Sequence, residues 1–321
     1  MIPAQTTRFG VGEILPGSVT VTPDSTAFLV SLDPVSFSET LGGLCPACVP
    51  LAGSTVPKPA FTGGFTSILG LDPRIVSVTV VGGELVVEVE NGLNFDPLNP
   101  AGGAPGIATF TLADASDGDQ MALLTLDGTD TALPPGGTLT RSAPLLPGTV
   151  EGDLEITVQV DSPEGDAVTV DPAMSMAVTA STQDLLVSQV RADVSGEEVA
   201  LDPVDLGMDE IDQALTDRIV RGALVVDVVN PFAIGGSLDI VIEDLGSGNP
   251  YVEKTAVLGP GPESRLRIEL AREEFQTFLG RPGVFLSGRA RLAPDAGVVT
   301  MTPGQELVVE VSFDLTVEVG G

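Results

Sequence analysis

The sequence predicts an all-β protein built of two tandem β-sandwich domains. Composition is the first reason: Val and Thr are abundant, 38 Gly and 26 Pro supply many turns, and long amphipathic stretches of Ala, Leu, Glu and Lys are missing. Turn signals are the second reason, because they recur at roughly 8–12 residues, a spacing typical of sandwiches. Length is the third, since 321 residues suffice for two hydrophobic cores.

The sequence also repeats itself, which predicts that one fold was duplicated. Residues 85–91 (LVVEVEN) return as 224–230 (LVVDVVN), and residues 162–172 align without a gap on 293–303. The two motifs come in the same order in both halves. We therefore expect two copies of one sandwich.

These repeats define three predicted segments. The two sandwiches are expected at 75–195 and 196–321, and an N-terminal extension at 1–74 precedes them. The extension is rich in Pro and Gly but contains strand patterns at 18–23 and 27–32. Because its VTVTP run resembles runs in both repeats, a third partial copy and a chance match are both open.

Within the repeats, strands are expected where apolar and polar residues alternate between turn signals such as Gly82-Gly83 and Asp117-Gly118. The strands of the first repeat are expected at 76–81, 85–90, 108–112, 122–126, 137–141, 154–160, 168–170 and 174–187. Those of the second are expected at 223–229, 237–243, 254–258, 265–270, 284–292, 298–301 and 306–319. Strands this short and this closely spaced suit a sandwich.

A first short helix is expected between the two repeats, at 205–218. Asp205 suits its N-cap, because a side-chain oxygen there can accept a backbone N–H of the first turn. Met208, Ile211 and Leu215 would share one apolar face.

A second short helix is expected inside the second repeat, at 272–279. Phe275, Phe278 and Leu279 are spaced to cover an open end of the sandwich. Gly280 follows directly and is the residue type that most often ends a helix.

The segment 224–232 (LVVDVVNPF) resembles the water-stress and late-embryogenesis-abundant type 2 domains, in which a strand ends in Asn-Pro before a crossing strand. The resemblance covers about a hundred residues of the second repeat. The first repeat departs from it, with Asn91-Gly92 in place of Asn-Pro. The resemblance implies an immunoglobulin-like sandwich with a stabilising or binding role and no catalytic residues.

The chain is strongly acidic, with a net charge of −31, and only Lys58 and Lys254 of its 14 cationic residues are Lys. This charge excludes a nucleic-acid partner, because phosphate binding needs a basic surface. It would also oppose binding to an anionic membrane. It favours solubility, cation binding or a basic protein partner.

The sequence contains no His and no Trp. Without His there is no imidazole base near neutral pH, no Ser-His-Asp arrangement, and no usual ligand for zinc, copper or haem. A pair of carboxylates could still catalyse glycoside hydrolysis, but the aromatic residues that hold sugars are nearly missing. We therefore expect a protein that is not an enzyme and has no cofactor.

The two cysteines, Cys45 and Cys48, form a CPAC motif. A redox role would need a strand-to-helix setting, and the sequence predicts a loop with no helix after it. We expect a structural disulfide that pins a tight turn in an oxidising compartment.

Asp114, Asp117 and Asp119 form an acidic cluster beside Gly118. Closely spaced carboxylates suit Ca²⁺, which makes this cluster the candidate metal site. The alternative is that the Asp-Gly pairs are hairpin turns, since the full calcium-loop pattern is missing.

Localisation signals conflict. No apolar run is long enough to span a membrane and the N-terminus lacks a signal-peptide pattern, so the sequence predicts no direct membrane span and does not exclude the cytoplasm. The Thr/Val/Gly-rich composition with almost no Lys is typical of exported sandwiches. We favour an extracytoplasmic site, peripheral to the membrane.

The expected function is that of a structural accessory subunit docked on a larger membrane-protein assembly, such as a photosynthetic or respiratory complex. Its contact surface is expected in the N-terminal region, at Phe61, Phe65, Ile68, Leu69 and Leu71. The first alternative is a free adhesin-like or ligand-binding sandwich with Ca²⁺-stiffened loops. The second is a carboxylate enzyme.

Overall fold

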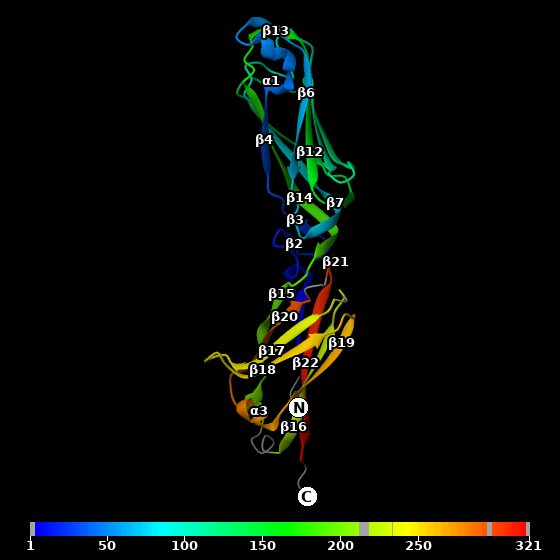
Figure 1. Cartoon of the computed structure of the whole chain (residues 1–321), viewed down its shortest axis with the longest axis vertical. Coiled ribbons are helices and arrows are strands. Elements are labelled where there is room, and N and C mark those ends of the chain that lie inside the picture. The colour runs from blue at the N-terminus through cyan, green and yellow to red at the C-terminus, as the bar shows by residue number, and fades with distance from the viewer. Residues whose placement is uncertain (1–3, 212–217, 233, 294–296, 319–321) are drawn as a thin grey trace. The chain divides into compact units, whose positions relative to one another are not determined.

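The computed structural model describes residues 4–211, 218–232, 234–293 and 297–318. They form antiparallel sheets in two compact units, which confirms the all-β sandwich prediction (Figure 1). One unit, here the continuous unit, spans residues 17–190. The other, here the split unit, combines residues 1–16 with 191–321. These units differ from the predicted boundaries 1–74, 75–195 and 196–321.

The split unit contains two four-stranded sheets. The first sheet has the order β1 (Gln5–Gly10), β22 (Glu306–Val317), β16 (Ile219–Val229), β19 (Glu263–Leu270). The second has the order β15 (Glu198–Asp205), β20 (Val284–Leu292), β17 (Gly236–Asp244), β18 (Asn249–Leu258). This unit also contains β21 (Val298–Met301). Its first strand therefore comes from the segment that was predicted as an extension.

The longer strands of the continuous unit follow the same arrangement. In one sheet these strands have the order β4 (Val35–Thr40), β14 (Ser175–Asp193), β7 (Ile75–Asn91), β10 (Thr138–Pro144), and the smaller strands β2 (Val19–Val21), β3 (Phe28–Val30) and β11 (Gly148–Val150) extend it. The other has the order β6 (Phe61–Leu69), β12 (Leu154–Ser162), β8 (Ile107–Asp114), β9 (Gln120–Asp127). The other smaller strands are β5 (Thr55–Lys58) and β13 (Gly165–Thr169). The strands predicted at 18–23 and 27–32 are β2 and β3, and β3 pairs with β14 beyond β4.

Both units are jelly rolls in their strand order. The eight main strands of each unit are numbered in chain order, leaving out β21 and the smaller strands. The first then pairs antiparallel with the eighth, the second with the seventh, the third with the sixth and the fourth with the fifth. Two sheets of nested antiparallel pairs are the jelly-roll arrangement. The immunoglobulin order has seven strands in a different sequence, so the sandwich is not immunoglobulin-like in topology. Common descent of the two units stays a prediction.

Alternating residues explain why these segments are strands. In β12, Leu154, Ile156, Val158 and Val160 are buried and the residues between them face outward. The predicted turn at Gly82-Gly83 is wrong, because β7 runs through it. Gly83 has φ +127°, and a Cβ there would lie 2.7 Å from a carbonyl oxygen of β14. The glycine bends the strand and does not end it.

The repeated motifs end in buried asparagines with the same hydrogen bonds. Asn91 closes β7 and Asn230 follows β16, and each side-chain Nδ2 donates to the carbonyl oxygen four residues later. Each Oδ1 accepts the N–H two residues later. Gly92 replaces the proline of the second repeat because its N–H donates to Ser175 O at 3.0 Å, a bond that proline cannot make.

The helix predicted at 272–279 is confirmed as α3 (Arg272–Phe278), followed by Gly280 at φ +73°. Phe275 and Phe278 are buried, with ring centroids 6.4 and 6.3 Å from that of Phe313. These aromatic contacts hold α3 against β22.

The helix predicted at 205–218 is wrong at its start. Asp205 ends β15, and its Oδ1 accepts the N–H of Gly207. A 3₁₀ turn, η3 (Met208–Glu210), follows. Residues 212–217, including the predicted face residue Leu215, lie outside the described residues.

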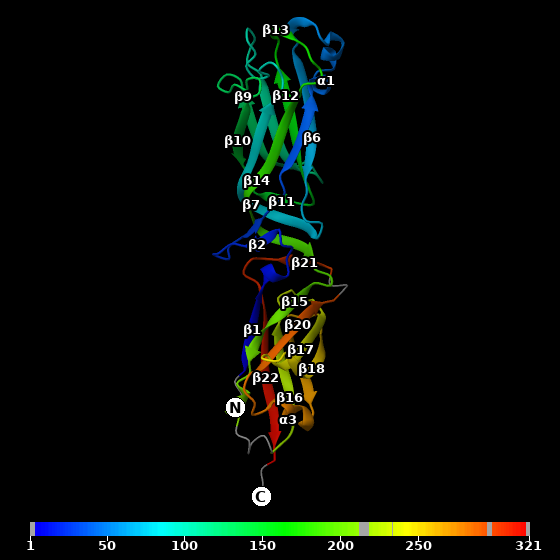
Figure 2. The same cartoon turned by 90° about the vertical axis from the view of Figure 1, so that its left-hand side faces the viewer.

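Three further short helices lie near the N-terminus and were not predicted. They are η1 (Val11–Glu13), α1 (Leu41–Leu44) and η2 (Pro46–Leu51). In α1 the hydroxyl of Thr40 accepts the N–H of Gly43, which is an N-cap. Both views place α1 close to β13 (Figures 1 and 2).

Candidate functional site

A cavity of about 450 Å³ lies among loops at one end of the continuous unit. Its walls come from the end of β5, the loop after β7, the loop between β9 and β10, and β13. The lining residues are Lys58, Asn94, Phe95, Asp96, Asn99, Pro100, Ala101, Ala132, Pro134, Pro135, Asp166, Ala167 and Val168. A cavity of this size, largely apolar with a few polar groups, can hold a small molecule.

Lys58 lines this cavity, although its side chain is only 1% exposed. Its Nζ donates hydrogen bonds to the carbonyl oxygens of Pro59 and Pro163. The same atom lies 5.0 Å from the ring centroid of Phe61 and 5.2 Å from that of Phe95. Two carbonyl oxygens and two ring faces therefore replace the water that surrounds an exposed ammonium group.

Burial lowers the pKa of Lys58 to about 8, and the Glu164 carboxylate offsets this only in part. About half of the Lys58 side chains are therefore neutral near pH 8. A neutral lysine amine is a nucleophile, whereas the ammonium form is not. The residue that lines this cavity thus carries an amine that is partly neutral near pH 8.

Backbone contacts fix the loops around Lys58. The Asp96 carboxylate accepts the N–H of Leu133 at 2.7 Å, which joins the loop after β7 to the loop before β10. Gly165 allows a close approach, since a Cβ there would lie 2.8 Å from Pro100 and 3.5 Å from Lys58 Cδ. The position of the amine is therefore set by packing as well as by hydrogen bonds.

This site was not predicted from the sequence. Lys58 is one of only two lysines, but no local pattern indicates that it is buried. The prolines at 57 and 59 are the one local signal, because they suggest a rigid, extended backbone. The aromatic residues come from segments distant in sequence, and only the fold brings them together.

Cys45 and Cys48 form a disulfide, with their Cα atoms 5.3 Å apart. Both side chains are buried. The motif is not in a plain loop, as the sequence predicted, but joins α1 to η2. A buried disulfide is poorly placed to exchange with other thiols, so its position suits a structural role.

The acidic cluster around Asp114 makes turns. Asp114 is 1% exposed, and its carboxylate accepts the N–H groups of Glu151 at 2.6 Å and Ser116 at 2.8 Å. Asp117 accepts the N–H of Asp119 at 2.9 Å. Within the described ranges, no three or more acidic or sulfur side chains are grouped to hold a metal ion. These hydrogen bonds are those expected if the acidic cluster forms turns, the alternative to a metal site.

Asp114 is a strong hydrogen-bond acceptor inside the unit. Burial by itself would raise its pKa, but the N–H groups of Glu151 and Ser116 and the Ser116 hydroxyl donate to the carboxylate. The net pKa of Asp114 lies below its ordinary value. Its charge therefore stabilises the folded unit at neutral pH.

The predicted contact residues of the N-terminal region do not form one surface. Phe61 and Leu69 are buried at the two ends of β6. Phe65 points to the interior and packs edge-on against Phe37, with centroids 5.3 Å apart. Ile68, 45% exposed, faces outward, and Leu71 is half-buried after the strand. The prediction treated as one patch residues that alternate between the two faces of a strand.

The sheet β6, β12, β8, β9 lies in the continuous unit (Figure 2). The centre of its outward face carries no charged residue and is here called the threonine face. Strand register aligns eight residues at its centre in two rows: Thr66, Thr157, Thr111 and Leu123, then Gly64, Gln159, Thr109 and Thr125. The flanking positions add Ile107 and Ile68, both exposed, beside Glu155, Asp161 and Asp127. The continuous unit has 21 acidic and three basic residues, a net charge of −18, so an uncharged centre stands out.

The corresponding sheet of the split unit is charged at its centre. Its aligned rows contain Glu198, Arg289, Arg291 and Asp239. Arg289 and Arg291 lie 3.0 and 2.7 Å from Glu198. Two sheets with the same strand order therefore carry different surfaces.

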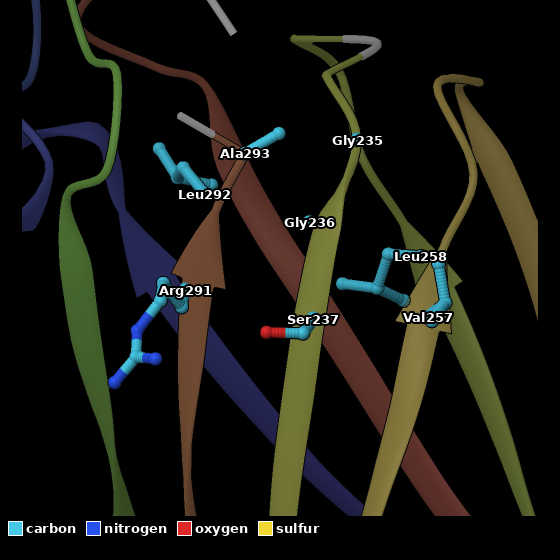
Figure 3. Close-up of a pocket in the computed structure, with 8 residues that line it drawn as sticks. All are labelled: Gly235, Gly236, Ser237, Val257, Leu258, Arg291, Leu292 and Ala293. Carbon is cyan, nitrogen blue, oxygen red and sulfur yellow. The ribbon is translucent and has the colours of Figure 1, made fainter. Parts of the chain in front are cut away.

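A second cavity, of about 350 Å³, lies at the ends of β17, β18 and β20 in the split unit. Its lining residues are Gly235, Gly236, Ser237, Val257, Leu258, Arg291, Leu292 and Ala293 (Figure 3). Figure 3 shows Arg291 on the opposite side from Val257 and Leu258. Because its guanidinium is paired with Glu198, this cavity offers little free polar chemistry.

No family model and no curated protein sequence matches this chain. Among solved structures, a predicted secreted protein from Parabacteroides distasonis is 10% identical, with a TM-score of 0.25, covering 96% of this chain and 99% of that one. Naturally occurring empty particles of cowpea mosaic virus give 8% identity, a TM-score of 0.23, and coverage of 94% and 93%. At these TM-scores the likeness supports no statement about function. Among the described helices, none has the length and apolarity needed to cross a membrane.

Proposed function

We propose that this protein is a non-catalytic interaction protein that docks on a partner protein through the threonine face. The partner is a membrane-protein assembly on its extracytoplasmic side, such as a respiratory or photosynthetic complex, and this chain is an accessory subunit of it. The proposal places no catalytic group on the chain.

The observation that carries the proposal is the absence of charge at the centre of the threonine face. Covering a charged side chain with a partner removes its water and costs free energy unless the charge is paired. The cores of protein interfaces are accordingly depleted of charged residues, and charges gather at the rim. Glu155, Asp161 and Asp127 occupy the rim here, in the rows next to the uncharged centre.

The disulfide supports the extracytoplasmic compartment. Cys45 and Cys48 are bonded and buried. Structural disulfides persist in oxidising compartments and are rare in the reducing cytosol.

Affinity isolation from gently solubilised membranes tests the proposal. The wild-type chain should recover one membrane-protein assembly in constant stoichiometry, and Thr111→Arg should abolish recovery because it places a long cation in the middle of the threonine face. Val241→Arg is the matched control, since Val241 lies at the middle of the corresponding sheet of the split unit. Equal loss with both variants, or equal recovery with both, would reject the threonine face as the docking site.

A second candidate function is a free ligand-binding sandwich, and the cavity beside Lys58 favours it. This candidate predicts recovery of the wild-type chain alone, as a monomer. It does not depend on the threonine face, so Thr111→Arg would leave ligand binding unchanged.

A further inference from the structure

The buried amine of Lys58 has no role in docking, yet it is costly to keep. Burying an ammonium group without a carboxylate in contact is unfavourable, and carbonyl oxygens and aromatic faces compensate only in part. The lowered pKa records this cost. Lys58 also lines a cavity large enough for a small molecule, and a titratable group with a shifted pKa beside a cavity is a candidate for a chemical role.

The charges around the cavity restrict the ligand. Asp96 and Asp166 line the wall, and Glu164 lies close enough to raise the pKa of Lys58. These carboxylates would repel an anion, and Lys58 in its charged form would repel a cation. Asn94 and Asn99 add two uncharged polar groups, and the other lining residues, including Phe95 and Pro100, are apolar. An uncharged molecule with an apolar body and one polar group fits best.

We propose that Lys58 binds small uncharged aldehydes or ketones with an apolar body, by reversible imine formation in this cavity. The neutral Nζ attacks the carbonyl carbon and forms a C–N bond. The carbonyl oxygen leaves as water, taking both hydrogens of the amine, and a C=N bond remains. No oxidant or reductant is needed, and hydrolysis releases the ligand and restores the amine.

The protein contributes position and exclusion of water. The carbonyl oxygens of Pro59 and Pro163 hold Nζ in place, and the rings of Phe61 and Phe95 keep the amine from bulk solvent. Exclusion of water slows the hydrolysis of an imine once it has formed. A fixed, partly neutral amine reacts without the entropy cost of ordering a flexible side chain.

The chain allows a clean test because it has two lysines. The full-length protein is incubated with benzaldehyde and sodium cyanoborohydride, which reduces any imine to a stable amine, and the modified sites are mapped by mass spectrometry. Lys58 should be modified at least tenfold faster than Lys254, which is about one-third exposed and pairs with Glu274 at 2.6 Å. The Lys58 rate should rise as the pH increases through about 8. Modification of Lys254 with Lys58 untouched would overturn the proposal and leave Lys58 a structural cation.

A variant at the cavity wall tests whether the ligand enters by this route. Ala132 is exposed and lines the cavity, so Ala132→Trp should slow modification of Lys58 and leave the Lys254 rate unchanged. An unchanged Lys58 rate would show that the aldehyde does not use the cavity and would contradict the proposal. The Lys254 rate serves as the internal control for reagent activity, because Lys254 lies in the split unit and Ala132 in the continuous unit.

Discussion

Replacing Phe9 by Ala tests whether the stability of the split unit depends on its N-terminal strand, β1. Phe9 is 3% exposed on β1, opposite Leu307 of β22. Replacing a buried Phe by Ala removes apolar burial and leaves a cavity, at a cost of about 3–5 kcal/mol. Typical domains are stable by about 5–15 kcal/mol, so Phe9→Ala should remove a large part of the stability of the split unit. The continuous unit should keep its stability, because β1 is not part of it.

Urea unfolding followed by hydrogen exchange and mass spectrometry measures the two units separately. In Phe9→Ala, peptides from β16, β19 and β22 should lose protection at lower urea than in the wild type. Peptides from β7, β8 and β12 should not change. Thr6→Ala is the control, since Thr6 is exposed on the same strand and its loss should cost less than about 0.5 kcal/mol. Loss of protection in β7 and β8 instead would refute the split unit and favour residues 1–74 as an extension of the first repeat.

Three further predictions concern single charges and hydrogen bonds. The free energy of unfolding of the wild type should rise by about 3 kcal/mol relative to that of Lys58→Met between about pH 8 and pH 10.5. Over this interval Lys58 keeps its proton in the unfolded chain and loses it in the folded one. Denaturation at a series of pH values measures this difference, and parallel plots of unfolding free energy against pH for the two proteins would contradict the lowered pKa. The pKa of Asp114 is lower in the folded protein than its ordinary value of 3.8 in the unfolded chain. The charge of Asp114 therefore stabilises the fold above pH 3.8, and this stabilisation is lost as the pH falls through the folded pKa. Asp114→Asn should have a lower free energy of unfolding than the wild type at pH 7, and acid unfolding should show a smaller difference at low pH. Gly92→Pro should destabilise the continuous unit by at least about 1 kcal/mol, because proline cannot donate to Ser175 O and its Cβ would lie 2.6 Å from that oxygen. An unchanged melting temperature would show that this bond is dispensable.

The sequence contained enough information for the fold class and for most strands. Alternation of apolar residues located β12 and β22, and the Phe spacing before Gly280 located α3. Strand order was not predictable in the same way, because alternation shows which face of a strand is buried and says nothing about its neighbours. The pairing of β1 with β22 joins residues about 300 positions apart, and no local signal indicates it.

In the candidate sites, too, local features could be predicted from the sequence and long-range ones could not. The hydrogen bonds of Asp114 and Asp117 are local, so the turn alternative could be stated from the sequence. The environment of Lys58 and the threonine face depend on several strands and loops, and they could not be read from any one segment. The threonine face is distinguished by missing charge, and its apolar residues alone do not mark it.

The most direct test of docking is hydroxyl-radical footprinting of the native protein in gently solubilised membranes, compared with the purified chain. Leu123 and Ile107 are 50% and 42% exposed on and beside the threonine face, so both should be oxidised in the purified chain and protected in membranes. Val257 of the split unit, 76% exposed, should be oxidised equally in both samples. Equal oxidation of Leu123 and Ile107 in the two samples would contradict docking through the threonine face.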